Sequence, residues 1–204
     1  MKKLILSVAV AALGLLQVNA QDAPIFGFAE GDVIVEGSVN FNSTNDKNSD
    51  VKTNKFGISP KVGFFISDDL AIGASLNVSS GKIESSGVDT SKKSEFGVGV
   101  FGRYYFLDLG ARFKTFTELG LGYNTSDDKI ADLKENTLGA NLDLGINYFV
   151  KENIALTFSL DNLISFSSSK YDVDGAKAVS SFDLGAGDVN NPFATASFGV
   201  LFKF

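Results

Sequence analysis

Five charged residues of this 204-residue chain fall well inside, rather than near the ends of, stretches where apolar and polar side chains alternate regularly. They are Glu36, Lys61, Arg103, Glu118 and Asp143. Three of them are carboxylates, and paired carboxylates are the groups that catalyse hydrolysis by general acid–base chemistry without histidine. Nothing in their spacing supports such a site, so we predict no catalytic residues. Because the set also holds two bases, the same side chains can form an ion-pair network, together with Tyr105.

The residue types that are missing exclude most enzyme chemistry. The chain has no Cys, which removes disulfides, thiolate catalysis and iron–sulfur clusters. It has no His, which removes Ser-His-Asp machinery and most transition-metal sites. We therefore expect no enzyme, no cofactor and no metal site. A formal charge of −6 argues against a nucleic-acid partner, which requires a basic face.

One glycine pattern invites a cofactor interpretation. Residues 97–102, GVGVFG, match G-x-G-x-x-G. Dinucleotide binding requires a helix to begin after this motif. The following residues 103–106, RYYF, continue the alternation instead, which indicates a glycine-rich strand. Residues 172–175, DVDG, hint at calcium, but the later ligands of an EF-hand loop are missing.

The first twenty residues have the features of a secretory signal peptide. Lys2 and Lys3 precede an apolar run over residues 4–16, and residues 18–20, VNA, are small at the positions before a cleavage site. We expect cleavage between Ala20 and Gln21, which leaves residues 21–204 as the mature domain. The alternative is an N-terminal membrane anchor, although the apolar run is shorter than the roughly 20 residues of a spanning helix.

The elements that must position the five charges are strands, because the hydrophobic period is two along the mature chain. We predict eight strands, over residues 32–42, 54–66, 70–79, 95–106, 112–124, 137–149, 154–162 and 193–204. One phase of these strands is apolar and uncharged, whereas the other carries glycine, serine, asparagine and the five charges. Long polar loops are expected near 43–53, 80–94, 125–136 and 163–192, with tight turns between them. Pro60 predicts a bulge or a local break.

Three features decide which phase faces inward. Small residues on the polar phase suit a narrow lumen, and long connections alternate with short ones as in outer-membrane barrels. Aromatic residues also gather near the strand ends, as at a membrane interface; they are Phe41, Phe64, Tyr104, Phe106, Tyr123, Tyr148 and Phe204. The sequence therefore predicts an all-β, eight-stranded antiparallel transmembrane β-barrel, an up-and-down meander with its apolar phase toward lipid. The alternatives are a soluble secreted lipocalin-like binding barrel, and a ten-stranded variant if residues 176–184 form an extra hairpin.

From about residue 32 the chain resembles the small outer-membrane β-barrel proteins of Gram-negative bacteria, such as the transmembrane domain of outer membrane protein A and outer membrane proteins X and W. The resemblance rests on the hairpins at residues 64–72 and 148–156 and on a final strand that alternates apolar residues and ends in Phe. Trp, usual in the aromatic girdles of this group, is absent. The residues of the terminal pattern are Phe198, Val200, Phe202 and Phe204.

This resemblance implies a bacterial outer-membrane location, with outer-membrane lipid and lipopolysaccharide around the barrel. It also implies that the barrel-assembly machinery recognises the C-terminal strand. We expect a non-enzymatic protein with a structural or surface-interaction role and a polar lumen plugged by the five charges, similar to the gating network of the outer membrane protein A barrel. The alternative is a narrow channel for small solutes or hydrophobic compounds. The sequence identifies no surface partner.

Overall fold

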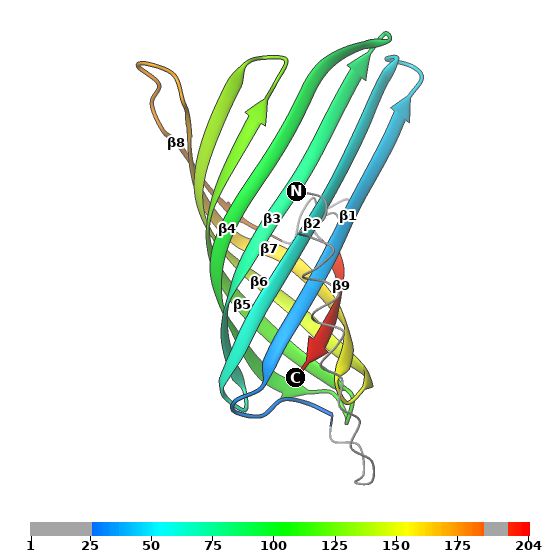
Figure 1. The fold of residues 1–204 in the computed structure, drawn as a ribbon, viewed down its shortest axis with the longest axis vertical. Helices are drawn as coiled ribbons and strands as arrows, with labels where there is room; N and C mark the ends of the chain where they lie inside the picture. The colour runs from blue at the N-terminus through cyan, green and yellow to red at the C-terminus, as the bar shows by residue number, and fades with distance from the viewer. Residues whose placement is uncertain (1–25, 186–195) are drawn as a thin grey trace.

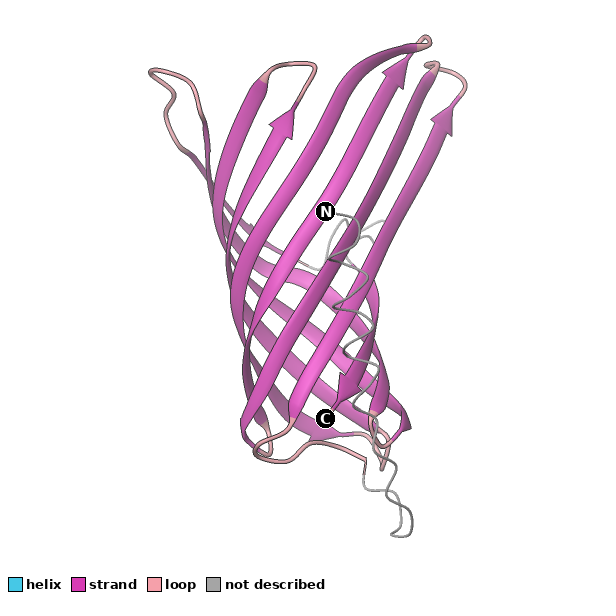
Figure 2. Ribbon diagram, viewed as in Figure 1, coloured by secondary structure: helices cyan, strands magenta, loops and turns pink. Residues whose placement is uncertain are grey.

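The computed structural model describes residues 26–185 and 196–204, so the expected signal peptide and the bond between Ala20 and Gln21 lie outside the described residues. No helix in the described part is long and apolar enough to cross a membrane. Figure 2 shows strands joined by short turns. The strands are β1 (Val33–Asp46), β2 (Val51–Ser67), β3 (Leu70–Ser85), β4 (Val88–Asp108), β5 (Phe113–Asp128), β6 (Leu133–Lys151), β7 (Ile154–Tyr171), β8 (Val179–Leu184) and β9 (Ala196–Lys203).

Eight of these strands close into a ring. Each of β1 to β7 pairs antiparallel with the next, and β9 pairs with both β7 and β1. Figure 1 shows the strands crossing the barrel obliquely. The remaining strand, β8, is not part of the ring and pairs with the upper part of β7, from Ile164 to Ser169. The apolar segment near residue 180 therefore extends the wall above the ring, and the ten-stranded alternative is wrong.

The strands run well beyond their predicted ends. β4 has 21 residues, although about 9–11 tilted residues are enough to cross a bilayer. The segments 43–53, 80–94 and 125–136, expected as long loops, are mostly strand, and their turns lie near residues 47–50, 86–87 and 129–132. Because these strands are longer than a bilayer requires, we infer that the ends of the hairpins extend beyond it. Both of their faces meet water there, so the alternation that marks a half-buried strand disappears from their sequence.

The apolar phase faces outward, as predicted. Val39 and Phe41 are 64% and 72% exposed, and outward residues of every strand of the ring are similarly open. Aromatic residues lie at two levels of this outer face. On β4, Phe106 and Phe96 are ten residues apart, and on β5 Phe113 and Tyr123 are also ten apart. At about 3.3 Å per residue and a tilt near 40°, ten residues rise roughly 25 Å, the height of the apolar band of such barrels.

Pro60 does not create the predicted bulge. The pairing of β2 with β3 skips Ser59 and Pro60, but the register is the same on both sides of the gap. The alternative that we predicted for Pro60, a local break in the strand pairing, is therefore confirmed. The larger irregularity lies between β6 and β7, where Asp143 is opposed by the three residues 161–163. Asn162 has a φ of 59° there, in the left-handed region.

Candidate functional site

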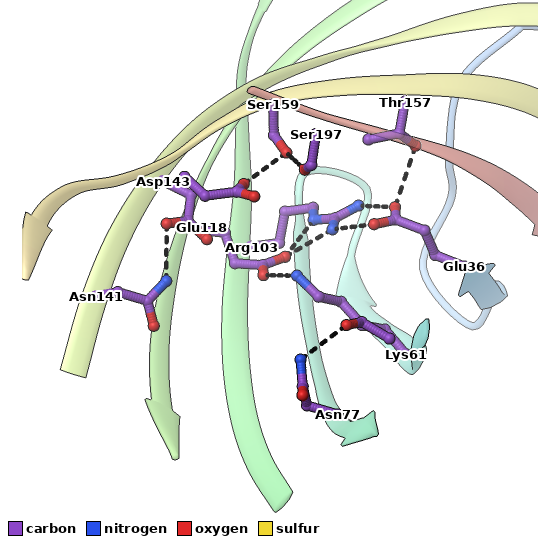
Figure 3. Close-up of polar contacts among 12 residues, drawn as sticks. Glu36, Lys61, Asn77, Arg103, Glu118, Asn141, Asp143, Thr157, Ser159 and Ser197 are labelled. Carbon is purple, nitrogen blue, oxygen red and sulfur yellow. Dashed lines mark hydrogen bonds and ion pairs between the residues drawn. The ribbon is translucent and has the colours of Figure 1, made fainter. Parts of the chain in front are cut away.

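The centre of the lumen is occupied by one guanidinium group held between two carboxylates. Arg103 of β4 is 1% exposed. Its Nη1 and Nη2 donate to the two carboxylate oxygens of Glu36 on β1, at 2.7 and 3.1 Å. Its Nε donates to Oε2 of Glu118 on β5 at 2.7 Å, and its Nη2 lies 2.6 Å from the same oxygen. Figure 3 shows this arrangement, in which Arg103 connects opposite walls of the barrel.

Lys61 of β2 completes the charged layer. By register it stands directly opposite Glu36, but its ammonium pairs with Glu118. Glu36 is already engaged by Arg103 in a two-bond contact, and Glu118 has its Oε1 available for the lysine. Two cations and two carboxylates therefore form one neutral cluster, which is the condition under which buried charges are tolerated.

Neutral side chains close this cluster into a ring of hydrogen bonds. Thr157 donates to Glu36 at 3.2 Å, and Asn147 donates to Thr157 at 2.7 Å. The Tyr105 hydroxyl donates to Asn147 at 2.7 Å and accepts a longer bond of 3.4 Å from Arg103. The ring joins β1, β4, β6 and β7, so it fixes the strands relative to one another across the lumen.

Asp143 does not join the ion pairs. It lies beside Glu118 in the register of β5 and β6, but its Oδ1 accepts from the Asn141 side chain at 2.7 Å and from the Asn162 backbone at 2.8 Å. The structure therefore brings four of the five predicted charges together, and it holds the fifth with neutral donors at the edge of the same layer.

Below the charged layer, on the side of the short turns, lies an aromatic layer that the sequence analysis missed. Each of the eight strands of the ring contributes one buried apolar residue to it, and four of these residues are aromatic, while Phe26 and Phe28 of the N-terminal segment pack against them partly buried. Phe28 stacks on Phe65 with centroids 4.4 Å apart, and its ring also lies 4.5 Å from Tyr105 and 5.2 Å from Phe149. Together with Phe116, these side chains fill the half of the lumen next to the short turns, which is the periplasmic half in barrels of this kind.

The segment that carries Phe28 is tied to the mouth of the barrel. Gly31 donates its backbone N–H to the carbonyl of Phe65, and Lys203 of β9 donates to the carbonyl of Gly27 at 2.8 Å. Arg112 lies over the ring of Phe26, 4.4 Å from its centroid. Residues 26–31 therefore cross this end of the barrel and close it, which the alternation does not predict because they precede the first predicted strand.

Two cavities with no described lining residue in common lie toward opposite ends of the barrel. The larger has a volume of 670 Å³ and lies above Arg103, with walls of serine, asparagine and glycine. The smaller has a volume of 140 Å³ and lies at the periplasmic mouth, next to Phe28 and Lys114. Among the described residues, none lines both cavities. The hydrogen-bonded ring and the aromatic layer fill the space between them.

Comparison with known families agrees with this architecture. The family model described as the outer membrane protein beta-barrel domain matches residues 8–204 of the chain. The chain belongs to this family. It is a bacterial outer-membrane protein with transmembrane β-strands, and the alternative of a soluble secreted binding barrel is wrong. Members of this family are generally not enzymes. The barrel is surrounded by membrane lipid, so the outward apolar face is the lipid face.

Solved structures of outer-membrane proteins match the chain at low sequence identity, and the first of them shows the same fold. The outer membrane protein OprG from Pseudomonas aeruginosa is 13% identical, with a TM-score of 0.52 over 87% of this chain and 98% of its own. Outer membrane protein W of E. coli is 16% identical over 87% of this chain and 99% of its own, with a TM-score of 0.47. Ail of Yersinia pestis is 13% identical over 86% and 99%, with a TM-score of 0.44. A search of the curated proteins gave no match.

The remaining motifs have structural roles in the described chain. Residues 97–102, the G-x-G-x-x-G pattern, lie in the middle of β4 and are followed by more strand. No group of three Asp or Glu side chains within residues 26–185 and 196–204 is placed to hold a metal ion. The terminal aromatic pattern lies on β9 and just after it, with Phe198 on the outer face at 69% exposure.

Proposed function

We propose that this protein is a non-enzymatic outer-membrane barrel with a closed lumen and a structural or surface-interaction role in the cell envelope. The observation that carries the proposal is the pair of stacked layers in the lumen. The ring around Arg103 and the aromatic layer around Phe28 leave no shared lining between the two cavities. Eight strands enclose only enough space for side chains, and here side chains occupy it.

Liposome swelling tests this proposal. The purified protein, folded in liposomes, should allow no more entry of small sugars or amino acids than protein-free liposomes do. The heat-induced change in gel mobility that folded barrels show should confirm that the protein is inserted. Swelling at a rate that increases with the amount of folded protein would refute the closed lumen and would favour the narrow channel.

Arg103→Ala distinguishes a closed structural core from a gate. In planar bilayers the gate interpretation expects this variant to conduct more than the wild type, because the guanidinium blocks the pathway. The structural interpretation expects no change, because the aromatic layer around Phe28 closes the lumen independently. Lys134→Ala, on the exposed end of β6, is the control for loss of a positive charge.

The C-terminal strand is the segment that we propose as the contact for the barrel-assembly machinery. β9 closes the ring, and the backbone of Phe204 exchanges two hydrogen bonds with Val33, at 2.8 and 3.0 Å. Removing Phe204 should lower the amount of folded barrel in cells more than it lowers refolding of the purified chain in detergent. Equal losses would indicate a purely structural role. Sequencing the mature N-terminus should give Gln21, as we propose for cleavage of residues 1–20.

A further inference from the structure

The larger cavity carries more negative charge than its own cations neutralise. Five carboxylates and two cations line it. Both cations are engaged by Glu36 and Glu118 in the neutral cluster described above. The remaining carboxylates belong to Glu95, Asp143 and Asp161, and no cation of the described residues pairs with any of them.

These three carboxylates are held by neutral donors. The Ser79 hydroxyl donates to Glu95 at 2.7 Å, and the Ser159 hydroxyl donates to Asp161 at 2.7 Å. Asp143 accepts from two amides, as described above. Hydroxyl and amide donors orient a carboxylate without removing its charge, so the electrostatic potential in the cavity stays negative.

Asp143 is the most deeply placed of the three. It is only 5% exposed, yet it lines the cavity. Both of its hydrogen bonds go to Oδ1, and no donor of the described residues reaches its Oδ2. The backbone distortion opposite Asp143 places Asp161 beside it, on the next strand. A deeply buried carboxylate without a cation costs several kcal/mol, so a positive group that reaches Oδ2 gains unusually strong binding.

The negative groups stand on different walls. Glu95 lies on β4, whereas Asp143 and Asp161 lie on β6 and β7. Figure 3 shows Asp143 on the side of the lumen where Ser159 and Asn141 converge. Between these walls the lining consists largely of glycine, serine and asparagine, which leave room for an extended chain. No three acidic groups in the described residues converge on one metal ion, so the arrangement suits a ligand with separated positive charges.

We propose that this cavity binds a linear aliphatic polyamine from the cell exterior. Its ammonium groups pair with the Asp143–Asp161 side and with Glu95, and its methylene chain runs along the glycine-rich wall between them. A cavity of 670 Å³ is within the usual size of small-molecule sites. Closure of the periplasmic end makes the cavity a binding site with one entrance.

Calorimetry with spermidine, at low ionic strength, tests the proposal on the full protein folded in lipid nanodiscs. The cavity variant is Glu95→Gln with Asp143→Asn and Asp161→Asn. The matched control, Asp132→Asn with Asp172→Asn and Asp174→Asn, removes the same three charges from exposed extracellular turns. Wild type and control should bind one spermidine per barrel, and the cavity variant should bind it at least about tenfold more weakly. Glutarate and a neutral polyol of similar length should not bind.

Equal affinities of the cavity variant and the control would overturn the proposal, as would the absence of saturable binding tighter than about 1 mM. A second measurement uses the wild type alone, in case the triple variant does not fold. Spermidine should shift the NMR signals of the Asn141 side-chain amide, which donates to Asp143. Binding without any shift of this amide would place the ligand outside the cavity and would also refute the assignment.

Discussion

The packing of the lumen predicts opposite effects for one substitution at two glycines. Gly145 of β6 points inward, and a Cβ added to it would lie 2.3 Å from Cζ of Phe116, with two more ring carbons within 2.8 Å. Gly102 of β4 points outward, and a Cβ added there would meet nothing within 4 Å. Gly145→Ala and Gly102→Ala therefore change the same residue type in the same way, in different environments.

The size of the effect follows from what surrounds Phe116. Its ring is 1% exposed, lies 4.1 Å from the Arg103 guanidinium carbon and packs against Tyr105. The ring cannot move away without disturbing these contacts. Overpacking of this kind costs about 1–3 kcal/mol, and weakening a desolvated cation–π contact adds up to about 2 kcal/mol. Gly102→Ala should be neutral or should stabilise the folded barrel by up to about 1 kcal/mol, because alanine lowers the conformational entropy of the unfolded chain.

Reversible urea unfolding in lipid vesicles, followed by circular dichroism or gel mobility, measures the difference. With a dependence of about 2 kcal/mol per molar urea, Gly145→Ala should lower the midpoint by about 0.5–2.5 M. Gly102→Ala should leave it unchanged or raise it slightly. Equal midpoints for the two variants would refute the described packing of the lumen.

Three further changes test the other layers. Arg103→Met should destabilise the barrel by about 3–5 kcal/mol in the same urea assay, because it leaves Glu36 buried without a cation and Glu118 paired with Lys61 alone; an unchanged midpoint would contradict the cluster. Phe28→Ala should cost about 3 kcal/mol and raise the proteolytic sensitivity of residues 26–32, because its ring packs into the aromatic layer; resistance equal to the wild type would contradict the closure of the mouth. At the outer end, a hydrogen bond from Ser91 and three backbone N–H groups lower the pKa of Asp128 from 3.8 to about 2. Since the pKa of Asp128 is lower in the folded protein, its carboxylate stabilises this turn fully above pH 4 and loses that effect as the pH falls toward 2. NMR titration of the Ile130 amide should follow this change, and a titration midpoint near pH 4 would refute the prediction.

The alternation of side chains predicted the barrel because two solvents act on the strands. Residues that face lipid must be apolar, whereas residues that face the lumen are small or polar. The chemistry of each residue within the bilayer therefore indicates which face of the strand it lies on. The signal ends where the bilayer ends. Residues 80–94 were expected as a loop because both faces of that hairpin meet water, although the backbone continues as strand almost to Ser86.

The positions of the lumen charges were also predictable, but their partners were not. Glu36 and Lys61 are direct neighbours in the register, yet Lys61 pairs with Glu118 and Arg103 takes Glu36. The pairing depends on which long side chains meet inside the closed ring. That follows from the shear of the barrel and the reach of each side chain, which one sequence does not specify.

A signal for the aromatic layer was present in the sequence. Three strands end at the periplasmic side with adjacent aromatic residues, Phe64-Phe65, Tyr104-Tyr105 and Tyr148-Phe149. Because neighbouring residues of a strand point to opposite faces, the first of each pair meets the lipid interface and the second enters the lumen. Phe65 and Phe149 are fully buried, whereas Phe64 and Tyr104 are about half exposed. Aromatic doublets in a barrel sequence therefore predict a plug as well as a girdle.

Glycine has two consequences in this lumen. Near Arg103, a Cβ on Gly73 would lie 2.5 Å from Cζ of Phe101 and one on Gly63 would lie 2.9 Å from Cγ1 of Ile34, so these glycines make space that larger apolar side chains fill. In the upper half Gly99 and Gly122 face only small side chains or backbone, and the space beside them remains as the cavity. A barrel selected for stability alone would gain from rings in both halves, at about 25 cal/mol per Å² of apolar surface removed from water. Above Phe101 and Arg103 the inward side chains of the cavity are mostly small and polar, which favours a role for the cavity itself, and its carboxylates make a cation its best-matched occupant.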